Sequence, residues 1–309
     1  MSNLIRVTLI SFLAYAVMSG MLAQIGILIG PISQHFGEET TIVSNQFSWL
    51  TVGILVGSVI SLFIFDYVRI KTLNLLVFTA ITLAIVGFYA VDLYWVNSIL
   101  LGIIGTGCGI ALPAAAIVIS RVYTPVRRAT MLVITDASFS LSGTFCTALV
   151  VIYLANGLHW SSGYSTVAAL ALVTLVLTAF STFPEVPHED QQTIKQELAS
   201  WPIGIYFCML ALLIYLTGQN FILIWLPNYA QQAISMSASD AGGLISNFWA
   251  GMLGGQLIAA AILIKADTRT MTLLAAILTA FSTIPLWSVN NPNYMPYLTF
   301  CWGFVTLGL

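Results

Sequence analysis

One carboxylate lies deep inside a long apolar stretch of this sequence: Asp136, within residues 129–154. If the stretch is a helix, polar and small residues follow at i+4, i+7, i+8 and i+11, so that one face carries Asp136, Ser140, Gly143, Thr144 and Thr147. A charged side chain at the centre of a bilayer costs about 3 kcal/mol on insertion scales, so it should face other helices or water. The pattern predicts a carboxylate that faces the interior of a helix bundle or a water-filled cavity.

The surroundings of Asp136 in the sequence allow two roles. No Lys or Arg lies inside an apolar stretch to pair with it, and desolvation without a cationic partner favours the neutral acid. Asp136 is then a proton-coupling group, with Ser140 one turn away as a hydrogen-bond partner. In the other role, Asp136 reaches water near the start of its helix and pairs with Arg127 or Arg128 as a structural clasp.

Further polar side chains inside apolar stretches are candidates for a solute-binding cavity. A buried amide without a partner costs about 1–3 kcal/mol, so each must reach another helix or a ligand. Together with two members of the Asp136 face, the candidates are Gln24, Ser140, Thr144, Gln219, Asn220 and Asn247. Hydrogen bonding between helices is the alternative role for each. For Trp49 and Trp249, near the ends of such stretches, the ordinary role is anchoring at the membrane interface.

The sequence does not indicate catalysis, metal binding or nucleic-acid binding. His35, His159 and His188 fall in predicted loops without metal-ligand spacing, and the four cysteines include no CxxC pair. The glycine-rich run from Gly102 to Pro113 lacks the Lys-Ser/Thr that follows in a phosphate loop. There is no basic patch for a nucleic acid. We expect no enzyme, no cofactor and no metal.

The composition is that of a protein that crosses a membrane many times. Of 309 residues, 59% are hydrophobic and 6% are charged, whereas a soluble domain has about 25% charged residues. Because a span needs about 20 mainly apolar residues, helices are predicted near 7–31, 45–65, 73–91, 97–119, 130–154, 164–183, 203–226, 241–264 and 271–289. A tenth begins near Tyr297 and runs to Leu309, so we expect an all-α membrane bundle that is a fragment or a truncated gene product.

The positive charges predict the orientation in the lipid bilayer. All nine Lys and Arg residues fall before the first predicted span or in a loop after an even-numbered span. The odd-numbered loops contain acidic residues and histidines but no Lys or Arg. By the positive-inside rule, the N-terminus is expected to be cytoplasmic.

Residues 184–200 differ from the other loops, because they contain two prolines and are rich in charge. We interpret them as a cytoplasmic linker between a six-helix half, residues 1–183, and a partial second half, residues 201–309. The two halves share a sequence pattern, AQIGILIGP from Ala23 and GQNFILIWLP from Gly218, which aligns Gln24 with Gln219. This pattern favours an internal repeat.

Pairs of glycines one turn apart predict close packing between helices. They occur at Gly26/Gly30, Gly53/Gly57, Gly105/Gly109 and Gly251/Gly255. Small residues at this spacing let two helix backbones approach closely in a membrane.

Several segments resemble a known family. The loop FDYVRIK (Phe65 to Lys71) resembles the loop 2–3 motif of the major facilitator superfamily, with Asp66 and Lys71 kept and the glycines absent. The chain is also similar to the TsgA-type inner-membrane proteins of enterobacteria, a branch of that superfamily. The resemblance lies in ISFLAYA from Ile10, TDASFS from Thr135, GQNFILIWLPNYA from Gly218 and MSASDAGGLISNFW from Met236. It implies a major facilitator-type bundle of twelve spans and a permease-like protein of the bacterial inner membrane.

Two functions remain open from the sequence. The first is a secondary active transporter, coupled to protons through Asp136, that moves a small solute across the bacterial inner membrane. The second is a protein with the transporter fold but without transport activity, acting as a sensor or scaffold or surviving as a decayed fragment.

Overall fold

The computed structural model describes residues 2–91, 93–184, 202–262, 268–289 and 291–306. These residues form helices and the turns between them, and no strand occurs among them. The helices are α1 (Asn3–Ala23), α2 (Ile25–Phe36), α3 (Thr40–Gln46), α4 (Ser48–Ile64), α5 (Ile70–Ala90), α6 (Tyr94–Val122), α7 (Pro125–Ala155), the 3-10 helix η1 (Trp160–Tyr164), α8 (Ser165–Ala179), α10 (Ile203–Ala233), α11 (Ala238–Ile262), α12 (Thr268–Ser288) and α13 (Met295–Thr306).

The predicted spans are confirmed. Within the described residues, nine helical segments are long and apolar enough to cross a membrane, and they coincide with the nine predicted stretches. The predicted tenth helix is α13, which begins at Met295. The protein is therefore an all-α, multi-pass membrane protein.

The first span differs from the prediction because it is two helices, α1 and α2, that meet at Gln24. The side-chain Nε2 of Gln24 donates to the Gly20 carbonyl at 2.7 Å. In a continuous helix the backbone N–H of residue 24 would donate to this carbonyl, so the amide side chain competes with the helix bond. The two helices together extend from Asn3 to Phe36, beyond the predicted 7–31.

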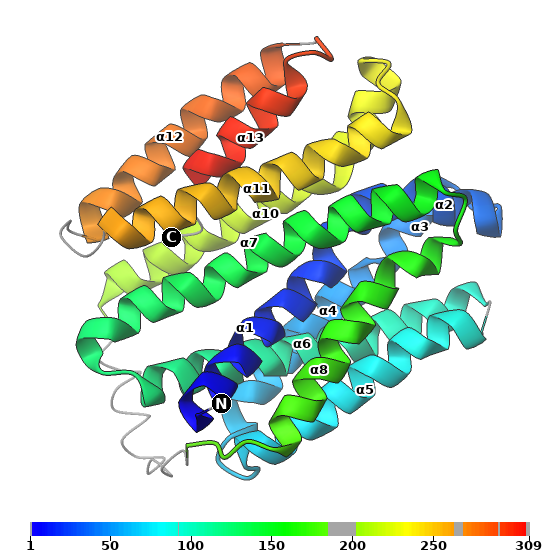
Figure 1. Cartoon of the computed structure of the whole chain (residues 1–309). Helices are drawn as coiled ribbons and strands as arrows, with labels where there is room; N and C mark the ends of the chain where they lie inside the picture. The colour runs from blue at the N-terminus through cyan, green and yellow to red at the C-terminus, as the bar shows by residue number, and fades with distance from the viewer. Residues whose placement is uncertain (1, 92, 185–201, 263–267, 290, 307–309) are drawn as a thin grey trace.

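The helices pack as two groups (Figure 1). In the first group, α1–α8, helix α1 packs against α6, α7 and α8, while α6 also contacts α4 and α5. In the second group, α10–α13, helix α11 packs against α10 and α13, and α12 packs against α13. The groups meet mainly where α7 lies beside α11, with a smaller contact between α2 and α10. Any site shared by the groups must lie along these contacts.

Two of the four predicted glycine pairs pack helix backbones together at both of their glycines. A Cβ atom at Gly53 or Gly57 of α4 would overlap the backbone of α6, and one at Gly105 or Gly109 of α6 would overlap the backbone of α4. A glycine also allows close helix packing in the second group, where Gly251 of α11 lies against the backbone of α13. Residues larger than glycine would force these helices apart.

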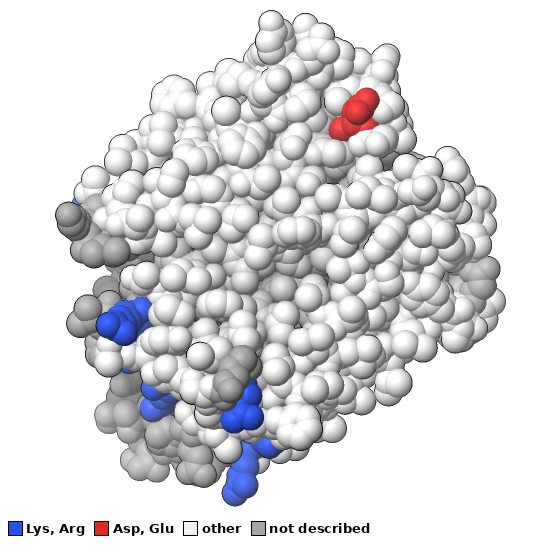
Figure 2. Space-filling view, viewed as in Figure 1, with Lys and Arg blue, Asp and Glu red and all other residues white. Residues whose placement is uncertain are grey.

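The described Lys and Arg side chains gather at one end of the bundle, here called the basic end (Figure 2). At this end, Lys71 Nζ donates to the Ala179 carbonyl at 2.9 Å, and Arg6 donates to the Phe180 carbonyl. Both carbonyls belong to the C-terminal end of α8, where cations stabilise unpaired helix carbonyls. Lys71 of the loop 2–3 motif thus ties α5 to α8, while Asp66 lies half-buried in the turn after α4.

Candidate functional site

A chain of hydrogen bonds links the two helix groups between α7 and α11. Gln256 of α11 donates its Nε2–H to Asp136 Oδ2 at 2.6 Å, and Ser140 Oγ donates to Gln256 Oε1 at 2.7 Å. Ser140 and Gln256 are almost completely buried. Asp136 lies about 16 Å along α7 from Pro125, at 1.5 Å per residue. The Asp136 carboxylate, Gln256 and Ser140 therefore form one polar contact inside the apolar bundle.

The structure shows which side chains surround Asp136, for which the sequence left two roles open. Within the described residues, its hydrogen-bond partner is Gln256, whereas Arg127 and Arg128 are exposed about two helical turns nearer the basic end. The Asp136 carboxylate is thus bonded to an uncharged amide of the second helix group, which Ser140 holds at its other end.

Gly143 makes room for a tryptophan on the same face of α7. The indole of Trp249 in α11 lies 2.7 Å from the position that a Cβ atom of Gly143 would take. It also packs against the Phe139 ring, tilted by 56° with ring centroids 5.4 Å apart. Trp249 is only 5% exposed, so it is packed between helices rather than at the membrane interface, where the sequence placed it. This prediction was wrong because the indole is covered by the other helix group.

Two buried polar atoms beside Gly143 have no hydrogen-bond partner in the structure: Ser19 Oγ and Trp249 Nε1. The Ser19 hydroxyl lies 3.1 Å from the Cβ position of Gly143. An unpaired buried donor costs about 1–3 kcal/mol. A water molecule or a polar solute that paired with either atom would remove this cost.

The remaining residues of the Asp136 face also contact α11 or their own helix. Ser246 Oγ of α11 donates to the Thr144 carbonyl at 3.1 Å, and buried Thr147 donates to the Gly143 carbonyl. Farther along, Asn247 lines a separate cavity of about 770 Å³ between the far ends of α7 and α11. The predicted helical face is therefore the face that α7 turns toward the second group.

The predicted position of Gln24 is wrong. Its Oε1 lies against Gly163, inside the first group, and has no hydrogen-bond partner among the described residues. The break between α1 and α2 occurs at this residue, and its amide is turned back toward Gly20. The prediction that Gln24 faces a cavity between the halves assumed an unbroken helix.

The two amides predicted in α10 differ from each other. Gln219 is buried, whereas Asn220 is exposed and donates to the Leu216 carbonyl of its own helix at 2.8 Å. The structure does not bring either of them into the hydrogen bonds around Asp136 that it describes.

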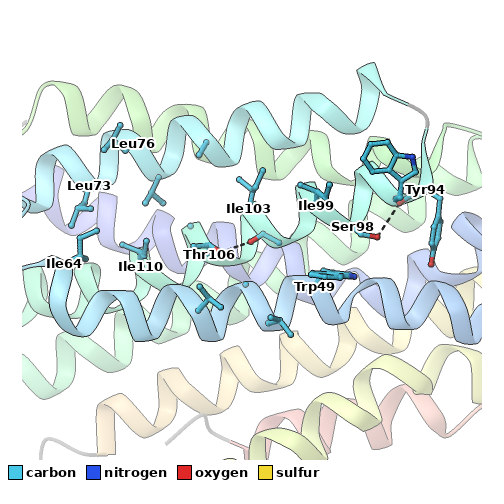
Figure 3. Close-up of a pocket in the computed structure, with 18 residues that line it drawn as sticks. Trp49, Ile64, Leu73, Leu76, Tyr94, Ser98, Ile99, Ile103, Thr106 and Ile110 are labelled. Atoms are coloured by element: carbon cyan, nitrogen blue, oxygen red, sulfur yellow. Dashed lines mark hydrogen bonds between the residues drawn. The ribbon is translucent and has the colours of Figure 1, made fainter.

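A groove of about 930 Å³ runs along α4, α5 and α6, away from this site (Figure 3). Its lining is almost wholly apolar, and the hydroxyls of Thr106 and Ser98 are bonded to carbonyls of α6 itself. Trp49 and Trp95, which also line the groove, are exposed. The groove offers mainly apolar contacts.

Gln256 is the functional candidate that the sequence search missed. It lies inside the predicted span 241–264, so the search for polar residues within spans that selected Gln24 would have found it too. What no sequence pattern indicated is that its amide reaches Asp136.

Two groups of membrane-length helices with a buried polar contact between them define the class of protein, a multi-pass membrane protein built from two helix groups. The family model of the Major Facilitator Superfamily matches residues 7–309. The chain belongs to the Major Facilitator Superfamily, whose members are secondary transporters. This membership points to a transporter rather than to an enzyme.

Curated relatives confirm the resemblance to TsgA-type proteins. The chain is 29% identical over 306 residues to the protein TsgA homolog of Yersinia enterocolitica, an alignment that covers 99% of this chain and 78% of the relative. The TsgA homolog of Yersinia pestis strain Pestoides F matches to the same extent.

Solved structures share the fold. The xylose transporter XylE from E. coli, in a partially occluded inward open conformation, superposes with a TM-score of 0.76 at 14% identity, covering 100% of this chain and 83% of that one. The E. coli fucose:proton symporter FucP gives a TM-score of 0.71 at 15% identity, covering 99% and 82%.

Proposed function

We propose that the protein is a proton-coupled secondary transporter of a small solute in the bacterial inner membrane, and that Asp136 binds the coupling proton. The observation that carries this proposal is the hydrogen bond from Gln256 to Asp136, because it joins a titratable group of one helix group to the other. A proton bound at this position changes a contact that must alter when the groups move.

The coupling follows from the strength of this hydrogen bond. A hydrogen bond to a charged group contributes about 1.5–3 kcal/mol, whereas one between neutral groups contributes about 0.5–1.5 kcal/mol. Protonation of Asp136 therefore weakens the α7–α11 contact by about 1–1.5 kcal/mol, or about tenfold in an equilibrium. The ionised form holds the two helix groups together near the basic end, and the protonated form lets them separate.

The moving parts in this proposal are the predicted halves, residues 1–183 and 201–309, joined by the linker 184–200. The linker lies outside the described residues from residue 185 on. In transporters built from repeats, alternating access is largely a rigid-body movement of one half against the other around a fixed site. Here the fixed site is the region of Asp136, Ser19 and Trp249, where unpaired polar atoms are available to a solute.

The related proteins support the location and suggest the first solutes to test. The TsgA homologs come from enterobacteria, which fits an inner-membrane protein. Two proteins with the same fold are named as proton symporters, one of D-xylose and one of fucose. We therefore place D-xylose and L-fucose at the head of a panel of sugars, amino acids and organic acids.

Solute-driven proton movement tests the function. With the full chain in proteoliposomes that enclose a pH-sensitive dye, adding a transported solute outside should carry protons inward and acidify the interior. Protein-free liposomes provide the control. If no member of the panel moves protons while the protein is folded in the bilayer, proton-coupled transport of these solute classes is wrong, and a fold without transport activity becomes the better hypothesis.

The orientation is proposed from the charges, with the basic end in the cytoplasm. The positive-inside rule predicts this orientation, and the opposite end carries Glu38 and Asp240. In intact cells, a membrane-impermeant maleimide should label Glu38→Cys and should not label Gln192→Cys in the linker. After the cells are opened, both should react. Labelling of Gln192→Cys alone in intact cells would reverse the assignment.

A further inference from the structure

A small cavity lies between the two helix groups at the end opposite the basic end. It measures about 290 Å³ and is here called the outer chamber. This volume corresponds to about ten water molecules in the liquid. Its lining comes from α2, the last turns of α7, the end of α10 and the start of α11, and consists of Gly26, Ile27, Gly30, Pro31, Gln34, Val151, Leu154, Ala155, Pro227, Asn228, Gln231, Ala238, Ser239 and Gly242.

The floor of the outer chamber is a tight contact between α2 and α10. A Cβ atom on Gly26 would lie 2.7 Å from the Ile224 carbonyl oxygen and 2.9 Å from that of Leu223. One turn farther along α2, a Cβ atom on Gly30 would have no neighbour within 4 Å. The two helices therefore touch at Gly26 and diverge beyond it, which separates the chamber from the Asp136 region.

Two prolines leave backbone acceptors at this floor. Pro31 in α2 and Pro227 in α10 have no N–H, so the carbonyls four residues earlier, of Ile27 and Leu223, lack their helix donors. Helix carbonyls point toward the C-terminal end, and both helices run toward the chamber. Ile27 lines the chamber, so its released carbonyl can accept a hydrogen bond from a solute there, whereas the Leu223 carbonyl lies in the floor, 2.9 Å from the Cβ position of Gly26.

The upper part of the chamber is polar but uncharged. Asn228 is half-buried in its wall, and exposed Gln34 and Gln231 stand at its rim. None of its fourteen lining residues is Asp, Glu, Lys, Arg or His. An ion that lost its hydration here would gain no opposite charge, whereas hydroxyl groups would find carbonyl and amide partners.

We propose that the outer chamber is a binding site for an uncharged, hydroxyl-bearing solute of the transporter, occupied before the solute passes Gly26. This inference rests on the proposed transport function and specifies its substrate class. The Ile27 carbonyl released by Pro31 accepts a hydrogen bond from a solute hydroxyl, and the amides of Asn228, Gln34 and Gln231 complete the site.

Protection of a cysteine in the chamber tests this site in the full chain. Gly30→Cys is introduced together with Cys208→Ser and Cys301→Ser, because those two native thiols are exposed. Labelling by an impermeant maleimide is timed with D-xylose, D-glucose or myo-inositol, and with D-glucuronate or D-glucosamine at equal concentration. An uncharged solute at about four times its Kd should slow labelling about fivefold, and the charged solutes should leave the rate unchanged.

A proline substitution tests the released carbonyl directly. Pro31→Ala restores an N–H donor for the Ile27 carbonyl, and the Kd for protection should rise about 2- to 10-fold, as expected for one lost hydrogen bond. Pro285→Ala is the matched control, since Pro285 lies inside α12 and does not line the chamber. The Kd of this control should equal that of the parent protein.

The assignment is wrong if no uncharged solute protects Gly30→Cys, if a charged solute protects it equally well, or if Pro285→Ala weakens protection as much as Pro31→Ala. Protection is measured without a proton gradient, so it is independent of coupling at Asp136. Proton flux without protection would overturn the chamber alone, and protection without proton flux would overturn the coupling alone.

Discussion

Asp136→Asn is expected to abolish uptake driven by a proton gradient while leaving exchange of solute across the membrane intact. Asparagine has nearly the same shape and still offers an oxygen to the Gln256 amide, so the contact between α7 and α11 is kept. It cannot bind or release a proton, so the strength of the contact no longer depends on the gradient. Exchange requires only that the loaded carrier reorients, which does not need a change in protonation.

The measurement compares two assays on the same vesicles, with a solute identified by proton flux. Gradient-driven accumulation should fall to the level of protein-free vesicles. Counterflow of labelled solute should stay within about twofold of the parent, because asparagine replaces a protonated, neutral acid and hydrogen bonds between neutral groups differ little in strength. Asp240→Asn is the matched control. Asp240 lies in the first turn of α11, where Ser237 Oγ bonds to its carboxylate, and asparagine is well tolerated near helix starts.

Continued accumulation of solute against its gradient by Asp136→Asn would refute a coupling role for this residue. Loss of the variant from the membrane, measured by immunoblot, would remove support for coupling and favour a structural role. Equal loss of accumulation and counterflow in a correctly inserted variant would assign Asp136 to solute binding instead.

Gly26→Val is expected to hold the outer end of the transporter open. The backbone oxygen of Ile224 lies 2.7 Å from the position of the new Cβ, and neither helix backbone can yield locally. Overpacking of this kind costs about 1–3 kcal/mol, which corresponds to about a 5- to 150-fold shift against the closed outer end. Gly26→Ala should have the same effect to a smaller extent.

Two measurements detect the shift of Gly26→Val toward an open outer end. Labelling of Gly30→Cys from outside should become faster when Gly26→Val is added. Solute uptake should fall at least tenfold, which lies within the shift of about 5- to 150-fold expected for the closed outer end. Gly218→Val is the matched control, because Gly218 lies in α10 with nothing within 4 Å of its Cβ position. Unchanged labelling and uptake in Gly26→Val would show that the contact between α2 and α10 does not close the outer end.

The sequence predicted the spans well because the signal is local. A stretch of about 20 apolar residues identifies a membrane helix without reference to its neighbours, and all nine predicted stretches reappear among the described helices. The glycine pairs were predicted to pack for the same reason. Their partners were not, since only the folded bundle brings Gly53 and Gly57 onto Gly105 and Gly109.

For the residues around Asp136, too, one part was predictable from the sequence and another part was determined only by the packing of the helices. The helical period determines that Asp136, Ser140 and Gly143 share a face, and the structure has them on one face of α7. The choice of Gln256 and Trp249 as their partners depends on how far α11 is displaced and rotated against α7. No spacing within a single helix contains that information.

The sequence by itself therefore determined the membrane class, the number of predicted spans and the polar face of the helix that carries Asp136, because each depends on composition or on the period of one helix. Tertiary structure decided that Gln24 turns into the first group, that Trp249 is buried, and that Gln256 bonds to Asp136. These outcomes depend on a local break in α1–α2 and on the register between two helices about 120 residues apart in the chain. Packing of whole helices sets that register.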